Sequence, residues 1–265
     1  MRHPQRKLAF VLAASDHGTM IVNRFDYRMV DERSGIGVGF QILEQASFDA
    51  SEIDTMLFLL GTRRQYFGDG VMAIDCGANI GVHTIEWANR MRGWGSVIAI
   101  EAQERIFYAL AGNIAINNCF NARAIHAAVA DRTGTMRVPI PDYLKPASFG
   151  SLELRAHAGT EFIGQPIDYS DSKTATISTV TIDSLDLARI DMIKIDVEGM
   201  ELEAIEGGKA SIARSHPIIL VEAIKTDAAK LRATLEQFGY RLFPLGMNLL
   251  AIHASDKSLN HVNLA

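Results

Sequence analysis

The hydrophobic positions of this chain form short continuous runs that alternate with sets of apolar residues at helical spacing. Short apolar runs bounded by glycine or polar residues are typical of buried parallel strands, and the intervening patterns are typical of helices. The predicted strands are 71–74, 97–100, 124–129, 192–196 and 218–222. The predicted helices are 82–91, one that ends near Asn118, 201–214 and 226–238. This alternation predicts an α/β fold with a doubly wound, mostly parallel sheet.

Both ends of the chain depart from this alternation. The segments 240–244 and 249–253 flank a turn and predict an antiparallel hairpin at the sheet edge. The first fifty residues carry turn signals and predict short strands, and a hairpin turns at 16–18. A helix from Asp49 or Ser51 to about Arg64 completes this small β/α cap.

These patterns predict an N-terminal cap over 1–66 and a catalytic domain over 67–265. Within the second domain, residues 131–180 interrupt the alternation with glycines, prolines and a polar stretch. We interpret this region as an inserted hairpin and loop, where substrate contacts are expected because loops on a rigid scaffold often carry specificity.

Composition narrows the function classes. The chain has 265 residues, a net charge of −5 and 48% hydrophobic residues, so neither nucleic-acid binding nor a membrane span is predicted. The basic start followed by apolar 8–14 looks like a short signal peptide, but the hairpin is the better interpretation. Two cysteines do not make a disulfide framework, and we expect a cytoplasmic protein.

The strand 71–74 leads into a loop of small residues with the spacing Asp75-x-Gly77-x-Asn79-x-Gly81. Such a loop lets a ligand approach the backbone at a helix N-terminus. It lacks the third glycine of the dinucleotide fingerprint. An acid at the strand end suits a ligand with a sulfonium and an ammonium group, whereas it would repel a pyrophosphate.

Glu101 ends the next strand, where a carboxylate can accept hydrogen bonds from a ribose diol. Together, Asp75 and Glu101 favour S-adenosylmethionine over NAD as the cofactor. Ala102, directly after Glu101, is included in the predicted cofactor site.

A second group of acids follows the later strands. Asp196 and Glu222 end strands that we expect to be neighbours, and Glu198 lies two residues after Asp196. Clustered carboxylates repel each other, which raises one pKa and favours proton abstraction from a hydroxyl. We predict these three as catalytic residues. They could equally hold a hard cation such as Mg²⁺, but no metal is predicted. Whether Lys194 pairs with an acid or takes part in chemistry stays open.

Several segments together carry a family resemblance, and Lys-Ile-Asp-Val-Glu-Gly at 194–199 is the most distinctive of them. The others are 74–81, Glu101, Asn113 with Asn117, 180–185 and 217–222. In this order they resemble the FkbM family of methyltransferases. His83 stands where the family usually has an aromatic residue, and Ile182 replaces the usual leucine.

The resemblance implies a class I methyltransferase (Rossmann-like) fold and S-adenosylmethionine as methyl donor. It also implies an acceptor hydroxyl on a sugar, glycan or polyketide-type small molecule. Carried over by position, the implied cofactor contacts are Asp75, Gly77, Ala78, Asn79, Gly81 and Glu101. Asp196 and Glu198 match the acidic pair of the family motif.

We therefore predict an S-adenosylmethionine-dependent O-methyltransferase. One alternative is an NAD-dependent oxidoreductase on a related sheet, and another is a non-catalytic module that only binds S-adenosylmethionine. The sequence leaves open whether the chain forms a homodimer.

Overall fold

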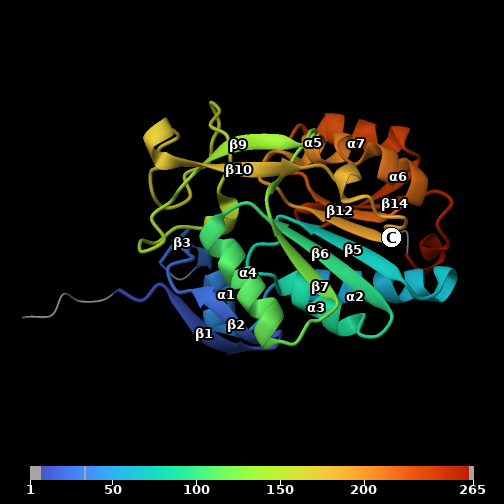
Figure 1. Ribbon diagram of the computed structural model, residues 1–265, viewed down its shortest axis with the longest axis horizontal. Coiled ribbons are helices and arrows are strands. Elements are labelled where there is room, and N and C mark those ends of the chain that lie inside the picture. Colours follow the sequence, from blue (N-terminus) through green and yellow to red (C-terminus); the bar gives the residue numbers. More distant parts are fainter. Residues whose placement is uncertain (1–6, 33, 263–265) are drawn as a thin grey trace, which may run out of the picture. The chain divides into compact units, whose positions relative to one another are not determined.

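The computed structural model describes residues 7–32 and 34–262, and its largest element is a seven-stranded sheet (Figure 1). The strand order is β13-β14-β12-β11-β5-β6-β7. The strands are β5 (Val71–Cys76), β6 (Gly95–Glu101), β7 (Ala122–His126), β11 (Met192–Ile195), β12 (Ile218–Glu222), β13 (Tyr240–Leu245) and β14 (Asn248–His253). β14 runs antiparallel to both of its neighbours, whereas β5, β6, β7, β11 and β12 pair in parallel. The predicted mostly parallel α/β fold with a C-terminal hairpin is confirmed.

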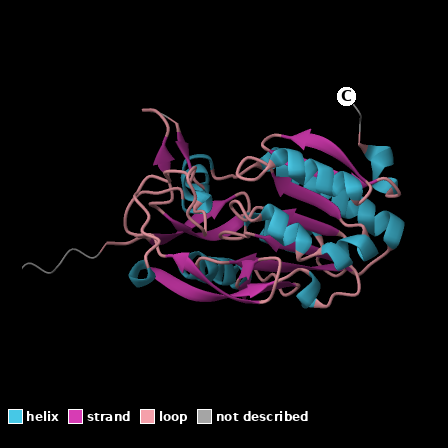
Figure 2. Cartoon of the chain, turned by 90° about the horizontal axis from the view of Figure 1, so that it is seen from above, coloured by secondary structure: helices cyan, strands magenta, loops and turns pink. Residues whose placement is uncertain are grey.

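Helices cover both faces of this sheet, which explains why its central strands consist mainly of apolar residues (Figures 1 and 2). One face carries α2 (Ala50–Phe67), α3 (Val82–Arg90) and α4 (Glu104–Ile116). The other carries α5 (Glu201–Glu206), α6 (Lys209–Ser215) and α7 (Ala228–Gln237). All four residues of β11 are buried, and so is Trp87 of α3. The core of the molecule therefore holds the carboxyl ends of β5, β6, β11 and β12 in fixed positions.

The described residues form two compact units. One combines the N-terminal segment up to Phe48 with Arg137–Ala175, and the other combines Asp49–Met136 with the chain from Thr176 onward. The central sheet and all the helices that cover it belong to the second unit. This division places α2 with the sheet and 137–175 with the N-terminal strands. The boundary at residues 66 and 67 stays a prediction.

The first unit contains the predicted hairpin and one helix that was not predicted. β1 (Phe10–Ser15) and β2 (Gly18–Asn23) pair antiparallel, and a second short pair joins β3 (Arg28–Met29) to β4 (Gly35–Ile36). The additional helix is α1 (Val38–Gln45). Its first turn contains glycine, which weakens the helical signal. Tertiary contacts supply the stability instead, because buried Asp26 accepts a hydrogen bond from the Gly39 N–H at 2.9 Å.

Two predicted elements are interrupted in the structure. The strand expected over 124–129 divides after β7, and β8 (Ala128–Val129) joins a separate sheet of order β8-β10-β9. That sheet also contains β9 (Gly134–Pro139) and β10 (Thr174–Val180) of the insertion. The helix expected over 201–214 breaks between α5 and α6. At this break Gly207 packs so closely that a Cβ would lie 2.1 Å from the Ala130 carbonyl oxygen.

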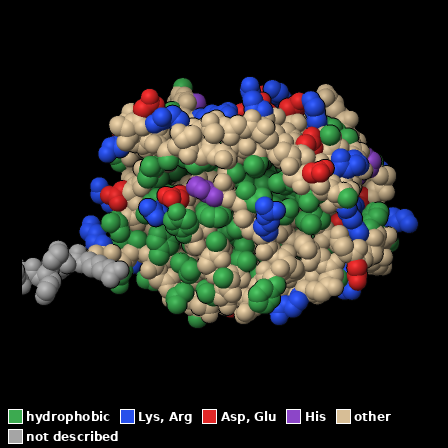
Figure 3. All heavy atoms as spheres, viewed as in Figure 1, with side chains coloured by type: hydrophobic (Ala, Val, Ile, Leu, Met, Phe, Trp, Pro, Cys, Tyr) green, Lys and Arg blue, Asp and Glu red, His purple; other side chains and the backbone are tan. Residues whose placement is uncertain are grey.

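Two further properties of the structure concern its charged side chains and the apolarity of its helices. Acidic and basic side chains are interspersed on the face shown in Figure 3, as the modest net charge of −5 leads one to expect. Among the residues that the structure describes, no helix combines the length and the apolarity that crossing a membrane requires.

Candidate active site

The glycine loop after β5 has a backbone that only glycine fits at two positions. Gly77 has a φ of +76°, and a Cβ there would lie 1.7 Å from the carbonyl oxygen of Asp196. Gly81 has a φ of +91°, and its Cβ would meet Leu110 at 2.5 Å. Positive φ values and close approach are the two situations that require glycine. The glycine loop therefore packs against the loop that follows β11 and against α4.

Hydrogen bonds from β6 and α4 fix the path of this loop. The N–H groups of Gly77 and Ala78 donate to the Ile100 carbonyl at 2.9 and 3.0 Å. From α4, the buried Asn113 side chain donates to the Ile80 carbonyl at 2.8 Å. A preformed loop of this kind lowers the ordering cost of binding a ligand.

Asp75 is buried at the end of β5 and keeps one carboxylate oxygen without a hydrogen bond. Its Oδ2 accepts from the Thr84 hydroxyl at 2.6 Å. Its Oδ1 has no partner among the described residues, although the side chain is only 1% exposed. A buried carboxylate oxygen without a donor is costly. This position therefore suits a ligand that brings an ammonium group or another hydrogen-bond donor.

Glu101 lies at the end of β6 and faces the same loop. Its two oxygens accept from the N–H groups of Asn79 at 2.9 Å and Gln103 at 2.7 Å. Burial raises the pKa of Glu101 to about 7, against the lowering effect of these hydrogen bonds. Each carboxylate oxygen has a second lone pair, so both can still accept from a ribose diol. The neighbouring Ala102 carbonyl is already engaged by His126 Nε2 at 3.1 Å.

These features together fit the predicted cofactor. The tightly packed loop has its path fixed by its neighbours, an unsatisfied carboxylate oxygen lies at one end of it, and a second carboxylate bonds to the Asn79 N–H of the loop. The assignment of cofactor contacts to Asp75, Gly77, Ala78, Asn79, Gly81, Glu101 and Ala102 stays a prediction.

The three predicted catalytic acids come together at the ends of β11 and β12. Oxygens of Asp196, Glu198 and Glu222 all lie within 4.8 Å of one another. The cluster also adjoins the glycine loop, because the Asp196 N–H donates to the Cys76 carbonyl at 3.0 Å. β11 and β12 are neighbours in the sheet, as the sequence predicted, and this parallel pairing brings Asp196 and Glu222 to the same end of the strands.

Two lysines accompany this cluster. Lys194, which is buried in β11, donates to Asp196 Oδ2 at 2.7 Å, so it pairs with an acid. Burial alone would lower the pKa of Lys194, but the charges of Asp196 and Asp75 hold it above its ordinary value. Lys225 forms an ion pair with Glu198. Three carboxylates and two ammonium groups leave one formal negative charge when all are ionised.

Glu222 differs from the other two acids because it has no ion pair with a lysine among the described residues. Its Oε2 is buried without a hydrogen bond. Burial and the charge of Asp196 raise the pKa of Glu222 to about 7. Burial and Asp196 also raise the pKa of Glu198, against the opposing effect of Lys225. A carboxyl group with a pKa near neutrality is well matched to accepting a proton.

Three contributors were missed by sequence reasoning. Lys225 lies in a loop after β12, and no spacing rule relates it to Glu198. Glu201 is fully buried and accepts from the N–H groups of Val197 at 3.2 Å and Gly199 at 3.0 Å, so it shapes the acid loop. Thr84 had a usable signal, since a hydroxyl in the first turn of α3 lies close to the strand end before it.

The chain is similar to several solved structures at low sequence identity. A methyltransferase described as FkbM from Methylobacillus flagellatus KT is 18% identical, with a TM-score of 0.49 over 71% of this chain. The chain spans 46% of that protein's length. A putative caffeoyl-CoA O-methyltransferase from Staphylococcus aureus is 11% identical, with a TM-score of 0.48, covering 81% of this chain and 89% of the other. No curated protein sequence matches the chain significantly.

A family model decides the classification. The methyltransferase FkbM domain matches residues 75–242, which is more than half of the chain. The matched range begins at Asp75 and includes Glu101, Asp196 and Glu222. This chain therefore belongs to the FkbM methyltransferase family.

Proposed function

We propose that this protein transfers a methyl group from S-adenosylmethionine to a hydroxyl oxygen of a small molecule, in the class of sugars, glycans or polyketides. One observation carries the proposal: the Asp196 N–H bonds to the Cys76 carbonyl, which joins the acid cluster to the glycine loop. A cofactor cradle and a set of proton-accepting groups therefore share one edge of the sheet. Family membership favours this reaction over hydride transfer with NAD.

In this proposal the chain's own residues bind, orient and deprotonate. S-Adenosylmethionine supplies a methyl group on a positively charged sulfur when it is bound. Asp75 would take its ammonium end and Glu101 its ribose hydroxyls. Positioning the acceptor oxygen next to the donor accounts for much of the rate of such a transfer.

Glu222 is the proton acceptor that the geometry favours. Lys194 and Lys225 hold the carboxylates of Asp196 and Glu198, whereas Glu222 Oε2 has no hydrogen bond to any residue that the structure describes. The proton of the acceptor hydroxyl would pass to this oxygen while the methyl group exchanges its bond to the donor sulfur for a bond to the acceptor oxygen, which would leave S-adenosylhomocysteine as the second product. Asp196 and Glu198, with their lysines, would keep the site charged and fix the loop.

The rim beside Glu222 favours an acceptor with apolar atoms near its hydroxyl. Ile224 is 57% exposed and lies two residues after Glu222. Met247 is 68% exposed and precedes Asn248, the residue paired with Glu222 on β14. Exposed apolar side chains next to a polar centre are typical of ligand sites.

The test compares Glu222→Gln with the unchanged protein on a panel of hydroxylated small molecules. We expect the variant to bind S-adenosylhomocysteine with unchanged affinity in calorimetry and to lose roughly 10²–10⁴-fold in transfer rate. In the unchanged protein the rate should fall as the pH drops through about 7, where Glu222 becomes protonated. The variant should lack this step.

Three outcomes would count against the proposal. Full activity of Glu222→Gln would remove Glu222 as the proton acceptor. Thermal stabilisation by NAD⁺ and not by S-adenosylhomocysteine would favour the oxidoreductase instead. Binding of S-adenosylhomocysteine without turnover of any acceptor on the panel would support the non-catalytic module.

A further inference from the structure

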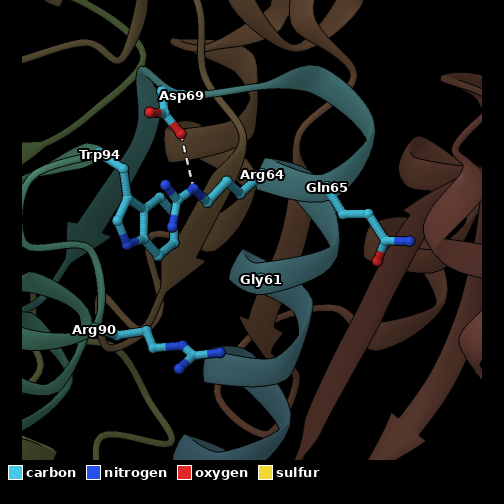
Figure 4. A pocket seen from close by; sticks show the side chains of 6 residues that line it. All are labelled: Gly61, Arg64, Gln65, Asp69, Arg90 and Trp94. Atoms are coloured by element: carbon cyan, nitrogen blue, oxygen red, sulfur yellow. Dashed lines mark hydrogen bonds and ion pairs between the residues drawn. The ribbon is translucent and has the colours of Figure 1, made fainter.

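A pocket of about 410 Å³ lies at the amino-terminal ends of the strands, opposite the candidate active site at their carboxyl ends. It is built where β5 and β6 begin, whereas Asp75 and Glu101 lie where these strands end. Figure 4 shows its lining, which is Gly61, Arg64, Gln65, Asp69, Arg90 and Trp94. Six residues of β5 separate the two edges, a length of roughly 20 Å at the usual rise per residue.

One side of the pocket is a stacked and braced pair. The Arg64 guanidinium lies 4.8 Å from the centre of the Trp94 ring, and its Nε donates to Asp69 Oδ1 at 2.7 Å (Figure 4). The loop that carries Asp69 is held in turn by Arg189, which donates to the Asp69 carbonyl at 3.0 Å. The Gly70 N–H bonds to the Trp94 carbonyl at 2.7 Å. Arg64 is therefore oriented by its surroundings.

The other side is Arg90, the last residue of α3, which points toward Gly61 of α2 in Figure 4. A Cβ at Gly61 would lie 3.4 Å from Arg90 Nη2, so the guanidinium rests against bare helix backbone. Gly61 is inside an 18-residue helix, where glycine costs about 1 kcal/mol relative to alanine. Its φ is not positive, so the glycine serves space and not backbone conformation.

The two guanidinium groups retain donors that nothing uses. Among the residues that the structure describes, Arg90 makes no hydrogen bond or ion pair, and Arg64 uses only its Nε. With Asp69 counted, the charged lining carries one net positive charge. Guanidinium groups bind phosphate oxygens through paired N–H donors, which gives both affinity and orientation.

We propose that this pocket binds the phosphate group of a small phosphate monoester, held between Arg64 and Arg90 with Trp94 as one wall. The site is separate from the methyl-transfer site and does not depend on the proposed function. Its volume is within the range of small-molecule pockets.

Titration with inorganic phosphate and with glycerol 3-phosphate tests the site. The two tryptophans differ, because Trp87 is fully buried and Trp94 lines the pocket, so a change in tryptophan fluorescence reports binding at Trp94. We expect saturable binding of both probes by fluorescence and calorimetry. Arg90→Gln should weaken it about tenfold, as expected for loss of one charged hydrogen-bonding partner.

Arg92→Gln is the matched control. Arg92 is also exposed and close in sequence, but it bonds to Asn89 and does not line the pocket. It should leave phosphate affinity unchanged, and both variants should bind S-adenosylhomocysteine as the unchanged protein does. The proposal is overturned if neither probe binds saturably, or if Arg92→Gln weakens binding as much as Arg90→Gln. Binding only to vesicles that contain phosphatidic acid would also overturn it, because the phosphate would then be a lipid headgroup.

Discussion

At the scale of single residues, Gly68 and Gly77 have nearly the same φ in opposite surroundings. Their φ values are +77° and +76°. No atom lies within 4 Å of a Cβ placed at Gly68, whereas a Cβ at Gly77 would collide with the Asp196 carbonyl. The pair separates the cost of a positive φ from the cost of steric overlap at the candidate site.

Replacing each of these glycines by alanine should give different results. Gly68→Ala should lower the free energy of unfolding by about 1–2 kcal/mol, because alanine is strained at positive φ. Gly77→Ala should cost more and should also abolish binding of S-adenosylhomocysteine, since the loop must move away from Asp196. Denaturant unfolding and calorimetry measure the two effects. Equal losses of stability with binding retained in both variants would show that the contact with Asp196 does not matter.

At the scale of elements, one buried arginine joins three of them. Arg63 of α2 donates through Nε to Oδ1 of Asp191, which precedes β11, at 3.0 Å. It donates through Nη1 to Oδ2 of Asp256, which precedes the short turn Lys257–His261, at 2.6 Å. Both contacts are almost free of solvent, with the two aspartate side chains at most 1% exposed. Removal of Arg63 would leave the buried Asp256 carboxylate without its ion pair, whereas Asp191 would keep its contact with Arg189 at 2.7 Å.

We expect Arg63→Leu to lower the free energy of unfolding by about 3–5 kcal/mol. Arg64→Leu is the neighbouring control, because its ion pair with Asp69 is exposed and such pairs contribute about 0–1 kcal/mol. Urea unfolding of both variants makes the comparison. A loss of similar size in the two would mean that burial does not strengthen the Arg63 contacts.

The elements also show which parts of the fold the sequence could specify. Strands such as 192–196 were predictable because a continuous apolar run can only be buried, and the acids that follow such strands were placed with them. The break at Gly207 was not, since it depends on contact with Ala130, far away in the sequence. The helix α1 was hidden for the same reason, because Asp26 supports it from another segment.

The candidate site divides in the same way. Asp75, Glu101, Asp196 and Glu222 could be assigned because each directly follows or ends a strand. The partners that set their chemistry could not. Glu198 has a φ of +55°, a conformation that is unusual for this residue type, and this turn is associated with its pairing to Lys225. No local pattern predicts such a backbone.

At the scale of the whole molecule, buried carboxyl groups with raised pKa values occur in both units. Burial raises the pKa of Asp26 to about 6 in the first unit, and that of Glu101 to about 7 in the second. Raised values mean that the folded state holds these protons more tightly than the unfolded state. The stability contributed by the protonated forms is therefore present at low pH and is lost as the pH rises through the folded pKa.

For Asp26 this window extends from about pH 4 to about pH 6. In the unchanged protein we expect the free energy of unfolding to fall by roughly 2–3 kcal/mol across this window because of Asp26. The Asp26→Asn variant should not show this decrease. Asp26 Oδ2 accepts from the Gly39 N–H and Oδ1 from the Phe149 N–H, both at 2.9 Å, so asparagine keeps one of the two acceptor oxygens, and the loss of the other lowers stability by the same amount at every pH. Urea unfolding at several pH values gives the pH dependence of the free energy of unfolding for both proteins. The same pH dependence in both would contradict a raised pKa for Asp26.

Cys76 connects these scales through its reactivity. The thiol is fully buried at the end of β5, and burial, assisted by the charge of Asp75, raises its pKa above the ordinary value. Oxidants and alkylating reagents attack the thiolate, and this one is both protonated and inaccessible. The glycine loop is therefore insensitive to redox conditions while the sheet edge is closed. The rate at which a thiol reagent modifies Cys76 would therefore report how often this part of the sheet opens, so the thiol is an intrinsic probe of local unfolding at the proposed methyl-transfer site.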